Sequence, residues 1–553
     1  MRLKHLSILF LILVALPAFA THTCTTCYID YVNGLDTNDG TTKTTGGGHG
    51  PWKLAPFMQT VTGNAASQVY AAGDSYIFKG GVVWPNSVMG MQIVFTSASS
   101  STAAVGCAGT GCIYIGVDQT WYDSTACAAK SYPGFCRPVM DTQGAQVATY
   151  PGGIGNTMLD TYGGSNGYII VDNIEWIGPV QLNNTGIPTV IALRCSQHCE
   201  YKNNYIHGWS HGGTATQDNA IFFSGGVGCP QDTTSSVHDN VVDGSDTTND
   251  MGMAAKGAPN YFYNNYIAYM RNGMIADSQF VWQNTWLHMN GSFDATSHGN
   301  VYEIAGCPVT FWNNRIDDSN GGATLFMGPL GSATYGSSDP DKVFNNLITT
   351  QANQPIQVAS NVCGGSCTGT GEYIFNNVIQ ITAGNTLHPI NGPGDGGGLF
   401  IPFMTIENNH FICDATNCNV NWGRTTTQTE VTDLSRTNAQ ATSDGYTQSE
   451  TYWYSPPSGS GITVGAGTNA VSLCNLLSNS APAMPLDDCK NDTSYGVGYD
   501  TTNHKVIVPG RTVVARPASA AWDIGPYQFG SSPSTTSAGM TGNVTVTGSV
   551  VVK

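Results

Sequence analysis

The chain is poor in charge, and its ionisable side chains gather in four similar segments in the middle of the sequence. Only 10% of its 553 residues are charged, against a usual quarter. The four segments are 218–225, 250–257, 271–278 and 299–306. If they are strands in register, alternation places Lys256, Asp277 and Glu303 on the outer face of three successive strands. The first position of the first three segments holds Asp218, Asp250 and Arg271.

Such a group of charges suits either catalysis or ion pairing. General acid–base catalysis needs ionisable groups held beside a substrate. The candidate catalytic residues are Lys256, Arg271, Asp277 and Glu303. The alternative is that Lys256 pairs with Asp277, and Asp250 with Arg271, between neighbouring strands. Because carboxylates beside Lys256 would keep it charged, they favour an electrostatic or acid role for Lys256 over the role of a base.

A second candidate surface is a row of aromatic side chains. An amide doublet recurs along the chain, and the residue two places before its second amide is often aromatic. These candidate substrate-binding residues are Tyr263, Trp282, Trp312, Phe344 and Phe375. Alternation sends them outward, because the residue before each one suits the core. Exposed rings would bind sugar rings, whereas the alternative is that a long loop or residues 426–530 cover them, since monomers avoid large exposed apolar patches.

The spacing of the doublets predicts the elements that must hold these residues. The second amide falls at residues 173, 204, 240, 265, 284, 314, 346, 377 and 409. Repeats of this length indicate a solenoid, and short β-branched and aromatic runs between Gly and Asn indicate strands. In a coil of parallel strands, equivalent residues stack about 4.8 Å apart, so the amides can form a ladder of hydrogen bonds.

The sequence resembles the pectate-lyase-like superfamily of right-handed parallel β-helices over residues 28–530. Besides the doublets, the resemblance rests on YVNGLDTNDG at 31–40, PWK at 51–53 and WDIGPY at 522–527. It implies an all-β fold: a single-stranded right-handed parallel β-helix, a solenoid with an Asn ladder and capped ends. This fold hosts lyases, hydrolases, epimerases and adhesins, so it does not decide the activity.

The resemblance also implies roles for the charged residues. Polysaccharide lyases of this superfamily use Lys or Arg to remove the proton beside a uronate carboxylate, often with Ca²⁺ neutralising that carboxylate. Lys256 would then be the base, Arg271 the carboxylate binder, and Asp218 and Asp250 the ligands of a Ca²⁺ cofactor. The chain departs from the main pectate lyase family, because it has no Trp-Ile-Asp-His block and no Arg-x-Pro-x-x-Arg block.

The N-terminus and the cysteines predict export. Residues 1–20 have a basic start, an apolar run and Ala18-Phe19-Ala20, as in a secretory signal peptide. The 16 cysteines form seven close couples, with Cys229 and Cys307 left as a long-range pair, which fits disulfides in an exported protein. Alternatively, close cysteines, or His207 and His211, could bind a metal ion.

Charge and length narrow the partners and divide the chain. A net charge of −17 argues against nucleic acid, and no later segment is long enough to span a membrane. We expect a signal peptide at 1–20, an N-terminal cap and early coils at 21–160, the regular β-helix at 161–425, irregular late coils or a C-terminal cap at 426–530, and a Ser/Thr-rich linker and tail at 531–553.

The function that these features favour is recognition and lyase-like cleavage of an extracellular polysaccharide by a secreted monomer. Two alternatives remain open from the sequence. A non-catalytic surface or adhesion protein would need only the Asn-, Thr- and Gly-rich surface. A glycoside hydrolase would need two carboxyl groups facing a groove.

Overall fold

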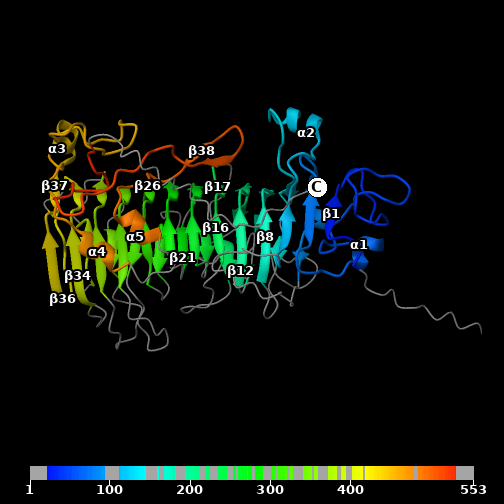
Figure 1. The fold of residues 1–553 in the computed structure, drawn as a ribbon, viewed down its shortest axis with the longest axis horizontal. Helices are drawn as coiled ribbons and strands as arrows, with labels where there is room; N and C mark the ends of the chain where they lie inside the picture. Colours follow the sequence, from blue (N-terminus) through cyan, green and yellow to red (C-terminus); the bar gives the residue numbers. More distant parts are fainter. Residues whose placement is uncertain are drawn as a thin grey trace, which may run out of the picture.

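The chain forms a long parallel β-helix in the computed structural model (Figure 1). The structure describes residues 22–93, 111–144, 158–160, 167–178, 180–181, 194–195, 197–211, 220–224, 235–245, 253–256, 260–270, 272–276, 280–289, 300–304, 308–320, 323–327, 340–351, 354–358, 371–382, 388–393, 401–414, 417–477 and 484–530.

Three parallel sheets run along the helix, with thirteen, twelve and eight strands, and are called the first, second and third sheet. The first sheet contains β1 (Thr26–Ile29), β2 (Ser75–Phe78), β5 (Ile113–Gly116), β8 (Gly167–Asp172), β12 (Gln197–Lys202), β16 (Ser236–His238), β19 (Tyr261–Tyr263), β22 (Phe280–Trp282), β25 (Thr310–Trp312), β28 (Asp341–Phe344), β31 (Glu372–Phe375), β34 (Ile401–Glu407) and β36 (Thr425–Val431). The second contains β3 (Val83–Pro85), β6 (Val139–Asp141), β9 (Glu175–Ile177), β13 (Tyr205–His207), β17 (Val241–Asp243), β20 (Tyr266–Ala268), β23 (Thr285–Leu287), β26 (Arg315–Ser319), β29 (Leu347–Thr350), β32 (Val378–Ile381), β35 (His410–Ile412) and β37 (Leu434–Arg436). The third contains β11 (Arg194–Cys195), β15 (Ala220–Ser224), β18 (Met253–Lys256), β21 (Asn272–Ala276), β24 (Tyr302–Ile304), β27 (Ala323–Met327), β30 (Gln354–Val358) and β33 (Ile390–Asn391).

A few short elements lie outside these sheets. Two further parallel pairs join β4 (Met91–Gln92) to β7 (Leu159–Asp160) and β10 (Val180–Gln181) to β14 (Ser210–His211), and an antiparallel hairpin joins β38 (Gly498–Asp500) to β39 (Lys505–Ile507). The short helices are α1 (Gly63–Ser67), the 3₁₀ helix η1 (Asn86–Val88), α2 (Ser124–Ala129), α3 (Asn438–Ser443), α4 (Val471–Asn475) and α5 (Met484–Cys489). The predicted parallel β-helix is therefore confirmed.

Alternation along the strands builds the core. In the first sheet the inward column includes Phe262, Val281, Phe311, Val343 and Ile374, all fully buried. Each lies opposite its equivalent on the next coil, so the apolar side chains stack along the helix axis. Burial of this continuous column provides the hydrophobic stabilisation that a single coil could not achieve alone.

The predicted asparagine ladder is confirmed for eight residues. Asn204, Asn240, Asn265, Asn284, Asn314, Asn346, Asn377 and Asn409 each donate from Nδ2 to the next side chain of the column. These bonds measure 3.0–3.2 Å, and the last one ends on Asp433. Because every amide donates towards the C-terminus, the final position needs only an acceptor, which a carboxyl group provides.

The earliest copy of the doublet was placed one residue too early, with the ladder position at 173 instead of 174. Strand β8 pairs Asp172 with Lys202, so Asn173 lies beside Asn203 and Ile174 takes the ladder position. Asn173 and Asn203 have φ of +63° and +57°, the left-handed conformation that a sharp bend requires and that Asn tolerates. A single Asn in an apolar frame did not reveal which of these two roles it has.

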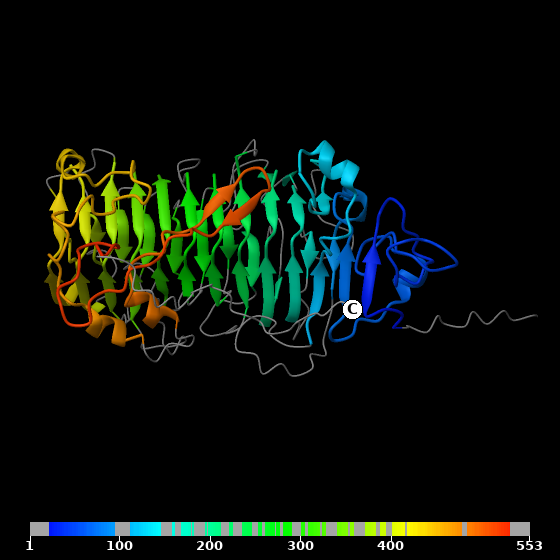
Figure 2. The ribbon, with the colours of Figure 1, turned by 45° about the horizontal axis from the view of Figure 1, so that its top comes forward.

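The chain returns along the outside of the helix after β37. Residues 438–530, called the returning segment, run from the C-terminal coils back towards the middle of the molecule (Figure 2). Thr468 accepts a hydrogen bond at its carbonyl from Asn408, and farther back Asn503 accepts one from Arg137 Nη1 at 3.0 Å. The segment therefore ties late coils to early ones, which no local repeat could do.

Short-range disulfides cross-link several turns of the chain. Bridges join Cys24 to Cys27, Cys127 to Cys136, Cys413 to Cys418 and Cys474 to Cys489, as the close couples predicted. The predicted pair Cys229 and Cys307, the signal peptide and the tail at 531–553 lie outside the described residues. Within the described part of the chain, no helix is long and apolar enough to cross a membrane.

Candidate functional site

Most of the charged residues singled out from the sequence cannot be placed. Asp218, Asp250, Arg271 and Asp277 lie outside the described residues, and the structure describes only the backbone of Lys256, in β18. The predicted catalytic and Ca²⁺-binding roles of these residues therefore stay predictions.

The predicted stacking of Lys256 on Asp277 is wrong at the level of strand register. Lys256 lies opposite Ile275, and Ile275 lies opposite Glu303. The position opposite Lys256 is therefore held by Ile275 and not by Asp277. Glu303 is partly exposed and accepts a hydrogen bond from Asn300 Nδ2 at 3.0 Å. The third sheet thus places Lys256 and Glu303 in one column, two coils apart.

The aromatic row lies on the outer side of the first sheet, as alternation predicted. Its rings stack coil upon coil, with centroids 4.2 Å apart for Tyr263–Trp282, 5.0 Å for Trp282–Trp312 and 5.1 Å for Phe344–Phe375. The expectation of exposed rings is wrong, however, because Trp312, Phe344 and Phe375 are at most 1% exposed. As the row lies in this structure, those three faces are closed to a sugar.

The returning segment covers the row, which was the alternative left open by the sequence. Leu473 and Leu477 pack on the rings together with Trp522, and the Cys474–Cys489 disulfide closes the covering helices α4 and α5. Trp312 Nε1 donates to Asp488 Oδ2 at 2.7 Å. Burial raises the pKa of Asp488 to about 6 although this hydrogen bond favours the charged form.

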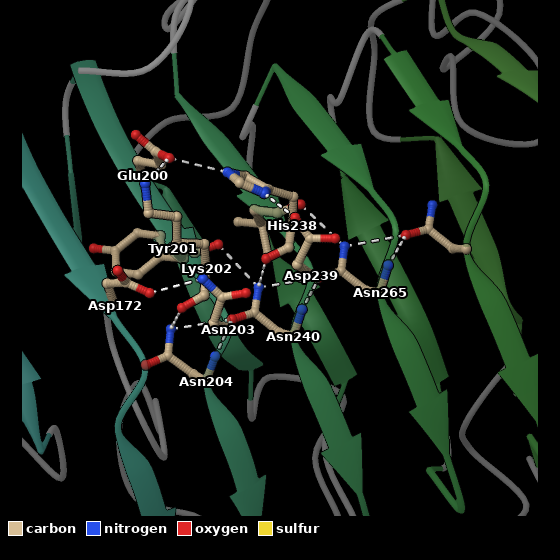
Figure 3. A network of polar contacts seen from close by, with 12 residues as sticks. Asp172, Glu200, Tyr201, Lys202, Asn203, Asn204, His238, Asp239, Asn240 and Asn265 are labelled. Carbon is tan, nitrogen blue, oxygen red and sulfur yellow. Dashed lines mark hydrogen bonds and ion pairs between the residues drawn. The ribbon is translucent and has the colours of Figure 1, made fainter. Parts of the chain in front are cut away.

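A cluster of ionisable groups replaces the aromatic rings at the N-terminal end of this row (Figure 3). The column that carries Tyr263 continues on earlier coils with His238, Lys202 and Asp172. His238 stacks on Tyr263, with ring centroids 4.5 Å apart and planes 3° from parallel. Lys202 and His238 occupy the same repeat position as the aromatic residues. The change from aromatic to ionisable residues at this position was therefore the sequence signal that could have revealed the cluster.

Glu200 is the centre of this cluster. Its Oε1 accepts from Lys202 Nζ at 2.7 Å and from His238 Nε2 at 3.1 Å, and the residue is 4% exposed. Burial would raise the pKa of Glu200, but the hydrogen bond and charge of His238, with the charge of Lys202, lower it to about 2. The second oxygen, Oε2, is buried and has no hydrogen-bond partner among the described residues.

The histidine of the cluster is held in its charged form. His238 Nδ1 lies 2.7 Å from Asp239 Oδ2, and its other nitrogen contacts Glu200. Burial would lower the pKa of His238, but these two carboxylates raise it to about 9. Lys202 has a raised pKa as well, because the charges of Glu200 and Asp172 outweigh its desolvation. Neither cation is therefore suited to act as a general base near neutral pH.

Asp172 behaves in the opposite way to Glu200. Tyr114 donates its hydroxyl to Asp172 Oδ2 at 3.0 Å, and Asn203 Nδ2 donates to Oδ1 at 2.8 Å. Burial raises the pKa of Asp172, and the nearby Lys202 charge offsets only part of that rise. Two carboxyl groups on adjacent coils therefore have pKa values moved in opposite directions, which is the arrangement that acid and base partners need.

A smaller group of charges on the second sheet includes one of the two candidate metal-binding histidines. His207 Nε2 contacts Glu175 Oε1 at 3.2 Å, and the ring stacks on Tyr205 with centroids 4.2 Å apart. The side chain of His211 lies outside the described residues. Among the residues that the structure describes, no group of three or more His, Cys, Asp or Glu could hold a metal ion.

Comparisons with known proteins return only distant matches. No family model and no curated protein matches the chain. Among solved structures it is similar to pectate lyase Pel9A, at 12% identity and a TM-score of 0.33 over 91% of this chain and 97% of that one. It is also similar to the native GH136 lacto-N-biosidase from Eubacterium ramulus, at 13% identity and a TM-score of 0.33 over 69% and 67% of the two chains. The selenomethionine form of that enzyme is similar at 11% identity and a TM-score of 0.34, over 74% of this chain and 68% of that one.

Likenesses this distant do not decide activity, so the function has to be argued from the site. The parallel pairing of its own strands shows that the chain is a parallel β-helix protein.

Proposed function

We propose that this protein binds a polysaccharide outside the cell and hydrolyses it at Asp172 and Glu200 on the outer face of the first sheet. The observation that carries the proposal is the pair of carboxyl groups with oppositely shifted pKa values. Asp172 would be the proton donor and Glu200 the base. Export is supported by the predicted signal peptide and by the disulfides of the described residues.

The backbone spacing of the pair suits hydrolysis with inversion. Glu200 lies one coil above and two residues before the position of Asp172, which puts their Cα atoms about 8 Å apart by strand geometry. Inverting glycosidases keep their carboxyl groups, rather than their Cα atoms, about 6.5–9.5 Å apart so that a water molecule fits beside the sugar, and a backbone spacing of about 8 Å is compatible with that separation. Oε2 of Glu200 is buried and has no hydrogen-bond partner among the described residues, so the proposed water would have to enter beside it.

The proposed reaction needs Asp172 protonated, which is the direction in which burial shifts its pKa, and Glu200 ionised. Neutral Asp172 donates its proton to the glycosidic oxygen as the bond to the anomeric carbon breaks. Ionised Glu200 accepts a proton from water, whose oxygen bonds to that carbon from the opposite face. Lys202 and His238 hold Glu200 charged between turnovers. Solvent then returns a proton to Asp172 and removes one from Glu200.

The test is a digest of neutral and uronate polysaccharides by the purified chain, with and without a chelator. We expect new reducing ends, no product with a double bond, and an inverted anomer in the product by NMR. Asp172→Asn and Glu200→Gln should each lower kcat at least about 100-fold, as for loss of a general acid or base. Asp487→Asn changes an exposed carboxylate in the same way and should retain activity.

Other outcomes would assign a different function. An unsaturated product that Lys256→Ala or Arg271→Ala abolishes would place a lyase site on the third sheet and refute hydrolysis at Asp172. Tight binding without turnover on any polysaccharide would favour the adhesion protein that the sequence left open.

A further inference from the structure

Three exposed side chains of different chemistry touch one another on the second sheet, apart from the carboxyl pair of the first. Tyr269 follows β20, His288 follows β23, and Asp318 lies in β26, so they come from three successive coils. The rings of Tyr269 and His288 have centroids 4.8 Å apart, and His288 Nδ1 lies 2.9 Å from Asp318 Oδ2.

These side chains are open to solvent. Tyr269 is 43% exposed, one of the few large hydrophobic residues so exposed among the described residues. The side chains of His288 and Asp318 are 41% and 40% exposed. An aromatic face, an imidazole and a carboxylate are thus presented together, whereas most rings of this protein are buried.

The backbone at this turn is one that glycine fits best. On two earlier coils the residue after the strand is Gly178 or Gly208, with φ of +89° and +66°, whereas Gly244 on the coil directly before Tyr269 does not have a positive φ. Tyr269, His288 and Asp318 have φ of +58°, +51° and +53° in the equivalent places. A left-handed residue other than glycine costs about 1–2 kcal/mol, so three successive coils carry a strain that glycine would avoid. Strained residues of this kind cluster at active sites and ligand-binding sites.

A neighbouring residue holds the carboxylate of the group. Gln351 Nε2 donates to Asp318 Oδ1, on the side away from His288. In the same strand as Asp318, the Arg315 guanidinium lies 5.1 Å from the ring centroids of both Trp453 and Tyr495, which belong to the returning segment. The returning segment therefore contacts strand β26, which carries Asp318.

We propose that Tyr269, His288 and Asp318 form a binding site for a ring of a neutral polysaccharide. The apolar face of a sugar would stack on Tyr269, because a tyrosine ring offers flat apolar area at low entropic cost. Asp318 accepts from sugar hydroxyls and Gln351 offers its amide. Asp317 and Asp318 together place two carboxyl groups at the turn, so a uronate would meet like charge. The site does not depend on the proposed hydrolysis, since it is defined by binding alone.

The test compares Tyr269→Gly with its parent in binding to soluble xylan, β-mannan, mixed-linkage β-glucan and polygalacturonate. Both proteins carry Asp172→Asn, so that turnover does not consume the probe. Because the turn favours glycine, Tyr269→Gly should fold and keep or raise Tm. We expect the parent to bind at least one neutral probe and the variant to bind it at least about tenfold more weakly. Phe529→Ala removes another exposed ring and should leave Kd unchanged.

Three results would overturn this proposal. The first is an unchanged Kd for every neutral probe in Tyr269→Gly. The second is a parent that binds none of the neutral probes. The third is preferential binding of polygalacturonate. If Asp172 and Glu200 variants retain full turnover while Tyr269→Gly loses binding, the hydrolysis proposal fails and the binding site stands.

Discussion

The C-terminal end of the asparagine ladder makes the stability of the protein depend on pH. Asp433 accepts from Asn409 Nδ2 at 3.0 Å, while its own Oδ2 is buried without a partner among the described residues. Burial raises the pKa of Asp433 to about 8, although both hydrogen bonds from Asn409 favour the charged form. An acid with a raised pKa in the folded state loses stability as pH rises from its unfolded value, about 3.9, to its folded value.

Replacing this carboxyl group by an amide should remove that loss. Between pH 3.9 and pH 7 the difference covers about 3 pH units, or about 4 kcal/mol at 1.36 kcal/mol per unit. Asp433→Asn keeps the acceptor for Asn409 and cannot ionise, so it should be more stable by up to that amount at pH 7. For a chain of this length about 1.1 kcal/mol/K accompanies unfolding, so Tm should rise by about 4 °C at pH 7.

The assay is thermal unfolding of wild type and Asp433→Asn from pH 4 to pH 8. The gap in Tm should be near zero at pH 4 and widen steadily to pH 7. Asp487→Asn removes an exposed carboxylate and should show no such widening. A gap that is the same at every pH, or a variant that is less stable at pH 7, would refute the reasoning.

Three further predictions concern the ladder and the covered aromatic row. Asn314→Ala should lower the free energy of unfolding by about 3 kcal/mol, because it removes the acceptor of Asn284 N and Nδ2 and one donor to Asn346 Oδ1 from a buried ladder, whereas Asn313→Gly should be tolerated at φ +55°; denaturant unfolding measures both. Phe344→Ala should cost about 3–5 kcal/mol by leaving a cavity under the returning segment, and wild-type stability would show that the cover is not packed there. Asp488→Asn should slow proteolysis of α4 and α5 relative to wild type above pH 6 but not at pH 4, because the wild-type carboxyl group loses stability between about pH 3.9 and pH 6; equal cleavage of the two proteins at pH 7 would contradict this.

Parts of the fold that repeat were predictable from the sequence. The eight amides from Asn204 to Asn409 fall in one column because each sits in the same apolar frame, and the frame repeats with every coil. Local pattern also sent Tyr263 and Trp282 outward, since strand alternation does not depend on distant contacts.

The predicted register failed where the repeat is short and its flanks vary. Lys256 and Asp277 were aligned through segment starts, but the strands pair Lys256 with Ile275. A shift of two residues leaves the same face outward, so strand alternation does not detect it, and short strands with variable flanks carry too little pattern to fix the register. The change from rings to His238 and Lys202 within one column was visible in the sequence, but its meaning depended on neighbours such as Glu200.

The sequence by itself determined the coil, its inward residues and its ladder, because each repeat carries the same pattern of apolar residues and asparagine. Only the tertiary structure decided what the outer face does. The returning segment has no repeat, and it reaches Trp312 and Arg137 from positions more than a hundred residues away in the chain. Whether an outward ring is exposed, or an outward carboxyl group is neutral, depends on burial by such distant residues, and burial by distant residues leaves no local pattern.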